Sequence, residues 1–534
     1  MRPYLQTAQA YLQVDNLVKA AEIWLDKVIT PTLGYSKPAI CRRISQEVAR
    51  QLVDPFLREN IEGYLNGKTY PDEAQKEFKC GEMKIAGAMG EITPTLRLRC
   101  SCIAKFMVWW LLCLLGFFRS IGKLKSGFGP ATLVYGVPVG DLKAGGSSQR
   151  FEDFCNKGPL DVLSNARMIL VEVANPIKGG MQSEKFRYSR YPLLSLFSSN
   201  RLSLPESMAF IIEHVRVFFS FVYLVTKQPI VCLLWRDFAD HAAVKAMNNK
   251  KLIKASIITN SNWRQQFLWM SDLPNRNYKT YLALYSLNFI SHQFKEAPHS
   301  PNHPSIRHLR VDLIWIWEEG YEKILRLEGV FCKTQVVGPI LWYLPEQNTH
   351  NLKSELLKIC VFDISPMNKE FLLSYGMLGS YYSTQTTTDY LSDVLAAVDE
   401  VRQQKDYEIE ITLKHKRKPS TEHDASYFDF VKNICESDDR IRLAREDANL
   451  YSLISVSDLV IVIPYSSPGY VAKCLDIQSL FYDPTNEILM SNEKLSPIRF
   501  ASGRENLTIE IANILACKVA IRSSAEVHSN KRQQ

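Results

Sequence analysis

Two short segments in the second half of the chain carry side chains suited to binding an anion. Residues 414–418 are five adjacent basic or imidazole side chains that follow the predicted strand 408–413. Ser466 and Ser467 follow an apolar run, 459–463, and precede a helix-like stretch. Hydroxyls and free backbone N–H groups at a helix start bind phosphate, and a nearby lysine or arginine adds charge-assisted hydrogen bonds. Together the two segments indicate a phosphate site.

Each segment alone also has an ordinary structural interpretation. A solvated basic turn accounts for residues 414–418, and a helix N-cap accounts for Ser466 and Ser467. Ligands of open α/β sheets bind beyond the carboxyl ends of the strands, and both segments follow strands of one predicted sheet. Their joint position therefore favours the phosphate site over the two ordinary interpretations.

Several common enzyme classes lack their motifs in this sequence. There is no GxGxxG, no GxxxxGK[ST], no HExxH and no GxSxG in a convincing context. Dinucleotide oxidoreductases, P-loop NTPases, zincins and serine hydrolases are therefore not indicated.

The strands that would position these segments belong to two series of short apolar runs. The first series comprises residues 132–135, 168–171, 229–234, 256–259 and 281–285, and the second comprises 358–362, 408–413, 459–463 and 479–482. Helices are predicted at 388–404 and 427–436 in the second series. Continuous apolar strands that alternate with helices predict a parallel sheet covered on both faces. The predicted fold class is α/β, with two Rossmann-like domains facing across a cleft.

The predicted domains follow from this division of the chain. Residues 1–128 are a helical N-terminal region, 129–345 the first Rossmann-like domain, 346–522 the second, and 523–534 a polar, disordered tail. At roughly 150 residues per domain, 534 residues are enough for this arrangement.

Composition excludes other classes of protein. With 46% hydrophobic and 22% charged residues, the chain is neither disordered nor collagenous. Because 64 Lys and Arg nearly balance 56 Asp and Glu, the net charge of +8 predicts no nucleic-acid partner. The 12 cysteines are scattered, and only Cys100 and Cys102 lie close together, at a spacing unsuited to a zinc or redox pair. No secretory signal opens the sequence, so a cytoplasmic location is expected.

One segment within the N-terminal region is unusually apolar. Residues 106–118 contain no charged or strongly polar side chain, and basic residues flank them on both sides. At about 1.5 Å per residue, this run covers only about two-thirds of a 30 Å hydrocarbon core. An apolar segment with a cationic rim suits insertion into one leaflet of the cytoplasmic membrane, at its inner face. A buried core helix and a true span are the alternatives.

A second apolar stretch, residues 208–225, contains Glu213, His214 and Arg216. Charged side chains are costly at the centre of a membrane. This stretch is therefore predicted to be an internal helix.

The order of several sequence blocks resembles a known family. Residues 462–467, Val-Ile-Pro-Tyr-Ser-Ser, and the later Tyr-Asp-Pro at 482–484 resemble the signature of the PFTS-motif family of bacterial surface-polysaccharide biosynthesis proteins. Tyr465 and Ser466 stand where Phe and Thr are usual. Further similar blocks are residues 259–263, 269–274, 336–346 and 361–366, so the resemblance covers about residues 130–515.

This resemblance implies a glycosyltransferase of the GT-B type with a nucleotide-sugar donor held mainly by the second domain. The basic strand end and the serine pair are also similar, more distantly, to the donor site of sialyl and Kdo transferases, which use CMP-sugars. By that similarity Ser466 and Ser467 hold the donor phosphate, and Lys414 and Arg417 neutralise it. His415 is then a phosphate contact or, as we expect, an ordinary surface imidazole. The nucleotide-sugar is a substrate, so no separate cofactor is expected.

A transferase also needs a base for the acceptor hydroxyl. Glu318 and Glu319, followed by Gly320, resemble the acidic motif that supplies the base in bacterial sialyltransferases. The apolar spacing of residues 311–325 is helical, however, and paired glutamates on a helix usually face solvent. Three aspartates of the first domain are rivals for this role: Asp237, Asp240 and Asp272.

The segment 292–308 concentrates four histidines and three prolines. Because prolines interrupt it, the segment cannot fix a helical pair of metal ligands, and no metal site is predicted. We interpret it as a mobile loop over the cleft. GT-B enzymes are typically metal-independent, which agrees with this interpretation.

The predicted function is transfer of a sugar from a nucleotide-sugar to a glycan or lipid-linked acceptor at the cytoplasmic membrane. Two alternatives remain open. One is a non-catalytic protein of the same fold that binds glycan or organises an assembly complex, and the other is a polyol-phosphate transferase.

Overall fold

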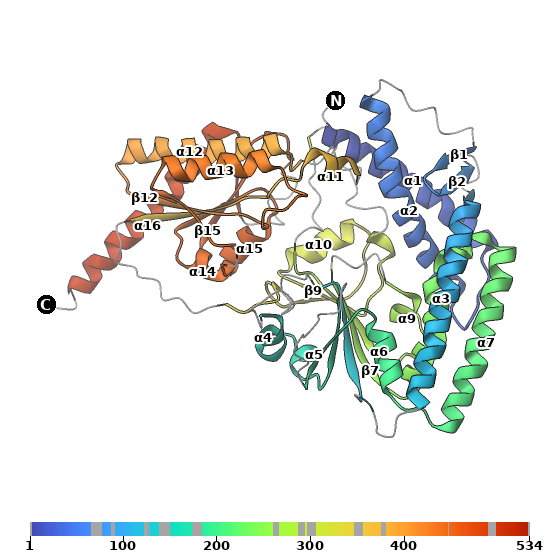
Figure 1. Ribbon diagram of the computed structural model, residues 1–534. Helices are drawn as coiled ribbons and strands as arrows, with labels where there is room; N and C mark the ends of the chain where they lie inside the picture. Colours follow the sequence, from blue (N-terminus) through green and yellow to red (C-terminus); the bar gives the residue numbers. More distant parts are fainter. Residues whose placement is uncertain are drawn as a thin grey trace.

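Two parallel sheets organise the chain, each in its own α/β domain (Figure 1). The computed structural model describes residues 3–65, 77–86, 91–121, 127, 129–137, 150–173, 184–259, 266–286, 294–295, 306–345, 356–374, 381–446, 448–489 and 498–531. The prediction of two Rossmann-like domains is confirmed.

The first domain is built on a seven-stranded sheet with the order β10-β9-β8-β7-β4-β5-β6. All of its strand pairs are parallel. Its strands are β4 (Ala131–Tyr135), β5 (Ile169–Glu172), β6 (Phe186–Ser189), β7 (Ile253–Thr259), β8 (Lys279–Ala283), β9 (Leu313–Ile316) and β10 (Thr334–Val336). Its helices are α4 (Arg150–Lys157), α5 (Asp161–Ser164), α6 (Pro192–Ser199), α7 (Leu204–Lys227), α8 (Trp235–Asn249), α9 (Leu268–Ser271) and α10 (Gly320–Leu327), with the 3₁₀ helices η4 (Pro229–Leu234) and η6 (Ile306–His308).

The second domain has a six-stranded parallel sheet with the order β13-β12-β11-β14-β15-β16. Counted along the chain, this is the order 3-2-1-4-5-6 of the Rossmann fold. The strands are β11 (Leu357–Phe362), β12 (Ile409–Lys414), β13 (Ile441–Leu443), β14 (Leu459–Val462), β15 (Gln478–Asp483) and β16 (Arg499–Ser502). The helices are α11 (Lys369–Ser374), α12 (Thr384–Lys405), α13 (Ala425–Ser437), α14 (Leu450–Ser455), α15 (Ser467–Cys474) and α16 (Arg504–Lys531).

Local sequence explains these elements. All four residues of β14 are buried because helices cover both faces of a parallel sheet. Helix α12 begins after Ser383, whose Oγ accepts a hydrogen bond from the backbone N–H of Thr386 at 3.1 Å. It ends at Asp406, which adopts a left-handed conformation with φ 55°.

The carboxyl edges of the two sheets face each other. Lys473 of α15 forms an ion pair with Glu318, which follows β9. The loop that follows β15 is reached by Lys295, whose backbone N–H donates to the carbonyl of Glu487 at 2.9 Å. Both contacts join segments that leave the carboxyl ends of strands, so this is the GT-B arrangement predicted from the sequence.

The N-terminal region packs on the first domain. It contains α1 (Pro3–Val28), α2 (Lys37–Leu65), α3 (Leu96–Ile121) and an antiparallel sheet of β1 (Glu77–Cys80), β2 (Met83–Ala86) and β3 (Glu91–Pro94). Arg307 of η6 pairs with Asp15 and Glu22 of α1. These contacts join the helical region to the first Rossmann-like domain.

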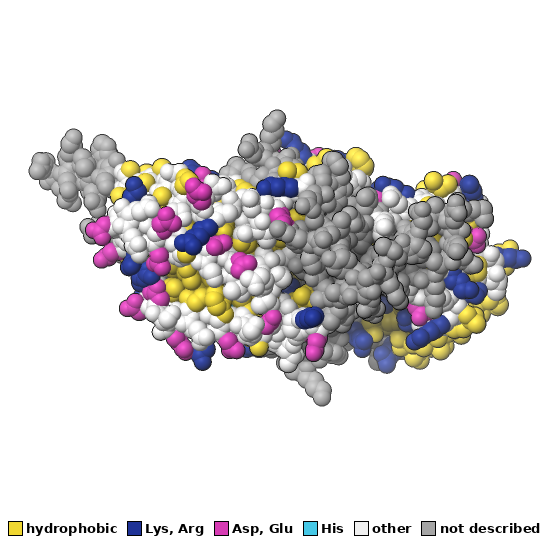
Figure 2. Space-filling model, turned by 90° about the horizontal axis from the view of Figure 1, so that it is seen from above, with side chains coloured by type: hydrophobic (Ala, Val, Ile, Leu, Met, Phe, Trp, Pro, Cys, Tyr) yellow, Lys and Arg dark blue, Asp and Glu magenta, His cyan; other side chains and the backbone are white. Residues whose placement is uncertain are grey.

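Helices α3 and α7 lie side by side at the flank of the first domain (Figure 1). Both are long and apolar enough to cross a membrane by length and composition. Each helix buries one side against the domain and exposes the other. Residues 208–225 were predicted to form an internal helix, and this prediction is wrong for the exposed side of α7. Figure 2 shows hydrophobic side chains with lysines and arginines beside them at the end of the molecule that holds these helices.

Three further sequence predictions are wrong in their local structure. Residues 229–234 form the 3₁₀ helix η4 rather than a strand, because Pro229 begins a helical turn that leads directly into α8. Residues 311–325 are not one helix but β9, a short turn and α10. Helix α16 continues to Lys531, into the tail predicted to be disordered, because no glycine or proline interrupts it.

Candidate functional site

The candidate site lies where the strand order of the second sheet reverses. Strand β11 pairs with β12 on one side and with β14 on the other. The chain continues from β12 to one side of β11 and from β14 to the other side. In open α/β sheets this reversal of strand order is where a ligand-binding crevice is expected, beyond the carboxyl ends of the strands. The predicted basic and hydroxyl segments follow β12 and β14, and both therefore border this crevice.

The buried carboxylate of Asp363, directly after β11, holds the edge of the crevice together. Its Oδ1 accepts hydrogen bonds from the backbone N–H of Ser365 at 3.2 Å and of Lys416 at 2.8 Å. Its Oδ2 accepts from the hydroxyl of Tyr427 at 2.9 Å and from Nδ1 of His415. One carboxylate thus fixes the ends of both β11 and β12, and sequence reasoning did not single it out.

His415 is buried, with 8% of its surface exposed, so the expectation of a surface imidazole is wrong. Phe428 contacts its ring edge-on at 4.9 Å between centroids. Because an ionised carboxylate only accepts, Nδ1 must carry the proton donated to Asp363. No described residue hydrogen-bonds to Nε2.

The basic segment divides its charges between two directions. The Lys414 ammonium donates to the carbonyls of His415 at 2.9 Å and Glu446 at 3.0 Å, so it is directed towards the β13 side of the sheet. Lys416 and Arg417 are exposed at the end of β12. Protein around Lys416 and the nearby charge of Arg417 lower the pKa of Lys416 to about 8, despite that exposure. The sequence includes Lys416 in the basic segment, but the similarity to sialyl and Kdo transferases assigns the phosphate contact to Lys414 and Arg417.

The serine pair stands at the N-terminus of α15, where an anion is favoured. Ser466 occupies the N-cap position, yet its hydroxyl makes no capping hydrogen bond. The preceding Tyr465 has φ 61°, a left-handed conformation that is rare for a bulky residue and turns the chain sharply out of β14. At Gly469 a Cβ atom would lie 2.9 Å from Phe481 and 3.0 Å from Val462, so glycine lets the helix start close against the sheet.

The two segments predicted to bind an anion are not adjacent. One strand, β11, separates β12 from β14, so the segments stand two strand spacings, about 10 Å, apart at one edge. Asp363 lies between them. A ligand that reaches both must be elongated, as a nucleotide with an attached group is.

The predicted bases face this edge from the first domain. Glu318 follows β9, and its carboxylate pairs with Lys473 of α15. The rings of Tyr321 and Tyr470 meet edge-on beside this pair, 5.9 Å apart between centroids. Glu319 is exposed at the start of α10. Glu318 therefore joins the domains, and Glu319 is the more accessible carboxylate of the two.

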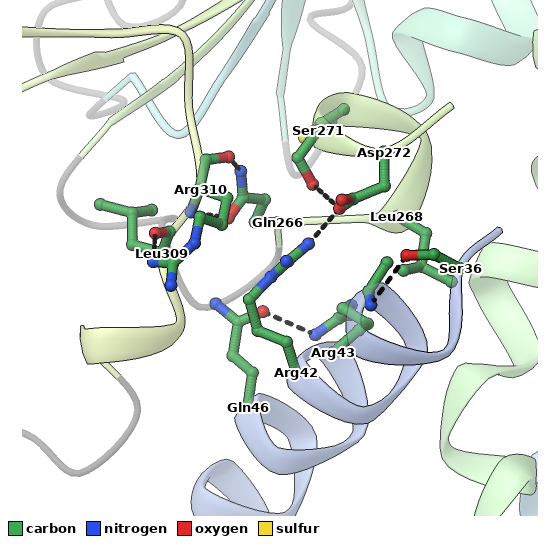
Figure 3. A network of polar contacts seen from close by, with 12 residues as sticks. Ser36, Arg42, Arg43, Gln46, Gln266, Leu268, Ser271, Asp272, Leu309 and Arg310 are labelled. Atoms are coloured by element: carbon green, nitrogen blue, oxygen red, sulfur yellow. Dashed lines mark hydrogen bonds and ion pairs between the residues drawn. The ribbon is translucent and has the colours of Figure 1, made fainter. Parts of the chain in front are cut away.

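The three aspartates considered as alternative bases form contacts between helices of the first domain and of the N-terminal region. Asp272 pairs with Arg42 of α2 and accepts from Ser271 (Figure 3). Asp237 accepts from the backbone N–H of Leu268 and lies 3.4 Å from Arg43. Burial raises the pKa of Asp237 to about 6, against the lowering effect of Arg43.

Asp240, the third rival, accepts from the indole N–H of Trp109 on α3 at 2.6 Å and from Nε of Arg236 at 2.8 Å. All three carboxylates thus anchor the N-terminal region to the first domain.

The predicted loop over the cleft is described in part. Phe294 forms an antiparallel bridge with Ile488 and is buried in the core of the second domain. Lys295 donates from its ammonium to the carbonyl of Asn486 at 2.8 Å. The segment thus crosses between the domains beside β15. His308 is buried and lies 3.0 Å from Glu22, whereas His292, His299 and His303 lie outside the described residues.

Within the described residues, no group of three or more His, Cys, Asp or Glu side chains is placed to hold a metal ion. The polar groups at the crevice are instead cations, hydroxyls and an imidazole. Such groups suit a phosphate rather than a metal ion.

Comparisons with known proteins give one family match and several structures of similar fold. The family model described as "Polysaccharide biosynthesis PFTS motif protein" matches residues 210–510. No curated protein sequence matches the chain. Several solved structures are similar at low identity.

A structure titled trehalose-6-phosphate from E. coli bound with UDP-2-fluoro glucose has a TM-score of 0.39 and 10% identity, and covers 74% of this chain and 93% of that chain. The wall teichoic acid polymerase TagF with CDPG has a TM-score of 0.37 and 9% identity, and covers 81% and 90%. Anabaena HepE in complex with UDP has a TM-score of 0.34 and 9% identity, and covers 76% and 100%. With TM-scores below 0.5, none of these structures supports a role for any residue here.

The buried carboxylate of Asp363 gives a prediction about stability. In Asp363→Asn, an amide NH₂ replaces an oxygen that accepts from two donors, so a buried hydrogen bond is lost. We expect the second domain to lose about 1–3 kcal/mol, measured as a lower urea midpoint of unfolding. The exposed Asp429→Asn on α13 is the matched control and should change stability by less than about 0.5 kcal/mol. Equal midpoints for the two variants would contradict the role given to Asp363.

Proposed function

This chain belongs to the family of polysaccharide biosynthesis PFTS motif proteins, and we propose that it is a metal-independent glycosyltransferase that uses a nucleotide-sugar donor. The observation that carries the proposal is the pair of anion-binding segments at the reversal point of the second sheet. Ser466 and Ser467 approach the crevice from β14, and Lys416 and Arg417 approach it from β12. The Ser466 hydroxyl makes no capping hydrogen bond, and Lys416 and Arg417 are exposed at the other strand end.

The donor's phosphate would occupy the start of α15. There the serine hydroxyls and the positive end of the helix favour a negative group. The cations and Nε2 of His415 would contact another part of the nucleotide-sugar, about 10 Å away. A CMP-sugar is the donor suggested by the similarity of these segments to sialyl and Kdo transferases. Lys414 would support the segment through its carbonyl contacts rather than touch the donor.

Transfer requires one proton to leave the acceptor and one bond of the donor to break. Glu319, accessible at the carboxyl edge of the first sheet, would accept the proton of the acceptor hydroxyl. The acceptor oxygen would form a bond to the sugar as the bond between the sugar and the phosphate breaks. The cations and serine hydroxyls would stabilise the departing phosphate. Glu318 would position α15 through Lys473.

The acceptor is proposed to be a glycan or a lipid-linked molecule at the inner face of the cytoplasmic membrane. Membership of a polysaccharide biosynthesis family supports a glycan product. The apolar helices at the flank of the first domain support a membrane location.

A non-catalytic protein of the same fold is the second candidate. The ion pair of Glu318 with Lys473 favours it, because one of the two candidate bases is already neutralised. Such a protein would bind a nucleotide or glycan without transferring sugar.

The serine pair provides the main test of the donor site. The hydroxyls of Ser466 and Ser467 form no hydrogen bond with a described residue, so Ser466→Ala/Ser467→Ala should leave stability unchanged. Loss of two hydrogen bonds to phosphate should weaken nucleotide binding about 10- to 100-fold by calorimetry, after a screen of CMP- and UDP-sugars on the intact protein.

The control for this test is Ser383→Ala, which removes a real helix cap. It should cost about 0.5–2 kcal/mol of stability and leave nucleotide affinity intact. If the intact protein binds no nucleotide, or if both variants bind equally well, the donor site is wrong.

The lowered pKa of Lys416 predicts how binding depends on pH. Its ammonium is charged below a pKa of about 8 and loses its charge above it. Affinity for a nucleotide should therefore fall as the pH rises from about 7 to about 9. In Lys416→Gln the affinity should be lower at neutral pH and should vary less over this range. The same pH dependence in both proteins would exclude Lys416 from the site.

The proposed role of Glu319 as the base is tested by the rate of sugar transfer to the acceptor. Glu319→Gln should reduce the rate about 100-fold or more and leave nucleotide affinity unchanged, because a base acts only in the chemical step. Glu318→Gln should retain the base and lose only the contact with Lys473. A Glu319→Gln variant with the full rate would assign the base elsewhere, and absence of transfer by the intact protein despite nucleotide binding would favour the non-catalytic candidate.

A further inference from the structure

Helices α3 and α7 form an antiparallel pair joined by aromatic side chains. In the first half of α3, Phe106 stacks on Phe221, with 4.0 Å between ring centroids. Near its end, Phe117 stacks on Phe210 at 4.8 Å. The order along α7 is reversed, so the start of each helix lies beside the end of the other. The two helices therefore act as one unit.

The inner side of this unit is fixed to α8. Both helices pack against α8. From α3, the indole N–H of Trp109 donates to Asp240 at 2.6 Å, and Arg236 lies 3.5 Å from the centre of that ring. From α7, Glu213 accepts from Lys245 at 2.9 Å. Since both helices use one side for α8, their outer sides point the same way, away from the domain.

The outer side is apolar along its length. Of 22 large hydrophobic side chains exposed among the described residues, 15 belong to these two helices. On α3 they are Leu96, Ile103, Val108, Leu111, Leu115, Phe118 and Ile121, and on α7 they are Leu204, Met208, Ile211, Ile212, Val215, Phe219, Val222 and Tyr223. A contiguous apolar surface of this kind on a folded domain marks an interaction site.

The charged side chains of the unit are mainly basic. Helix α3 contains no acidic residue. The acidic side chains of α7, Glu206 and Glu213, are paired with Lys250 at 2.7 Å and Lys245 at 2.9 Å. Basic side chains stand at both ends of the unit, Arg97 and Lys227 at one end and Arg119 and Arg201 at the other. Lys105 and Arg216 are exposed between the ends, and Arg216 pairs with Glu213. The side chain of Arg97 is 89% exposed. Figure 2 shows such lysines and arginines beside the hydrophobic side chains.

We propose that the outer side of α3 and α7 docks on a lipid bilayer that contains anionic lipids, with both helices lying in the plane of the interface. The apolar side chains would enter the boundary between headgroups and acyl chains, and the basic ends would contact anionic headgroups. This proposal goes beyond sugar transfer and does not depend on it.

An in-plane position agrees with the contacts of the inner side. A helix of 26 residues is about 39 Å long, enough to span a hydrocarbon core of about 30 Å. Spanning would carry the charged side chains Arg236, Asp240 and Glu213 into hydrocarbon together with the helices that they hold, which is energetically unfavourable. Docking on the surface leaves all of these contacts in place.

Vesicle binding by the full-length protein tests this surface. Purified protein is sedimented with vesicles of phosphatidylcholine alone and with vesicles of equal parts phosphatidylcholine and phosphatidylglycerol. We expect stronger binding to the anionic vesicles, and weaker binding when salt is raised. The triple variant Leu111→Gln/Leu115→Gln/Phe219→Gln should lower the affinity about tenfold or more, because three apolar side chains no longer enter the interface. Glutamine favours helix, so the thermal unfolding of the variant should match that of the original protein.

The matched control carries the same change at exposed apolar residues elsewhere, Leu327→Gln/Phe331→Gln/Ile509→Gln. It should bind vesicles like the unaltered protein. Three outcomes would overturn the proposal: no binding to either vesicle, equal loss in the two triple variants, or a dimer in light scattering that only the first triple variant dissociates. The last outcome would mean that a second copy of the chain covers this surface.

Discussion

Parallel pairing of β12, β11 and β14 is the constraint on which the candidate site depends. It places the carboxyl ends of three strands on one edge of the sheet. From β12 the chain continues to β13 on one side of β11, and from β14 it continues to β15 on the other side. The carboxylate of Asp363 then ties the ends of β11 and β12 together by hydrogen bonds. At β14 the left-handed Tyr465 and the absence of a side chain at Gly469 let a helix begin against the sheet. Backbone geometry thus creates the crevice, and side chains supply its charge.

The same edge also joins the two domains. Glu318 reaches Lys473 from the first sheet, and Phe294 enters the core of the second domain beside β15. A ligand held at the start of α15 therefore lies next to segments of both domains. On the far side of the first domain, α3 and α7 offer an apolar surface with basic ends. In the proposed orientation the membrane meets this flank, and the crevice between the domains stays in water.

Much of this architecture could be predicted from the sequence because continuous apolar runs identify buried parallel strands. The sequence predicted the strands β4, β5, β7, β8, β11, β14 and β15 from such runs, β12 from a segment that alternates apolar and polar residues, and the long helix α12. Short edge strands such as β13 and β16 gave no such signal, since few of their side chains are buried. Residues 229–234 were as apolar as a strand and formed a 3₁₀ helix, because hydrophobicity alone does not distinguish two buried conformations.

The residue types at the ends of β12 and β14, and hence the prediction of an anionic ligand, come from the sequence itself. Only the tertiary structure decided which of these residues face the crevice. The ammonium of Lys414, the last residue of β12, donates to backbone carbonyls, whereas Lys416 lies beyond the end of the strand and is exposed. His415 becomes buried because Asp363, 52 residues away along the chain, accepts its hydrogen bond. Likewise, the sequence made residues 208–225 apolar, but their packing on α8 from one side determined that the other side remains exposed.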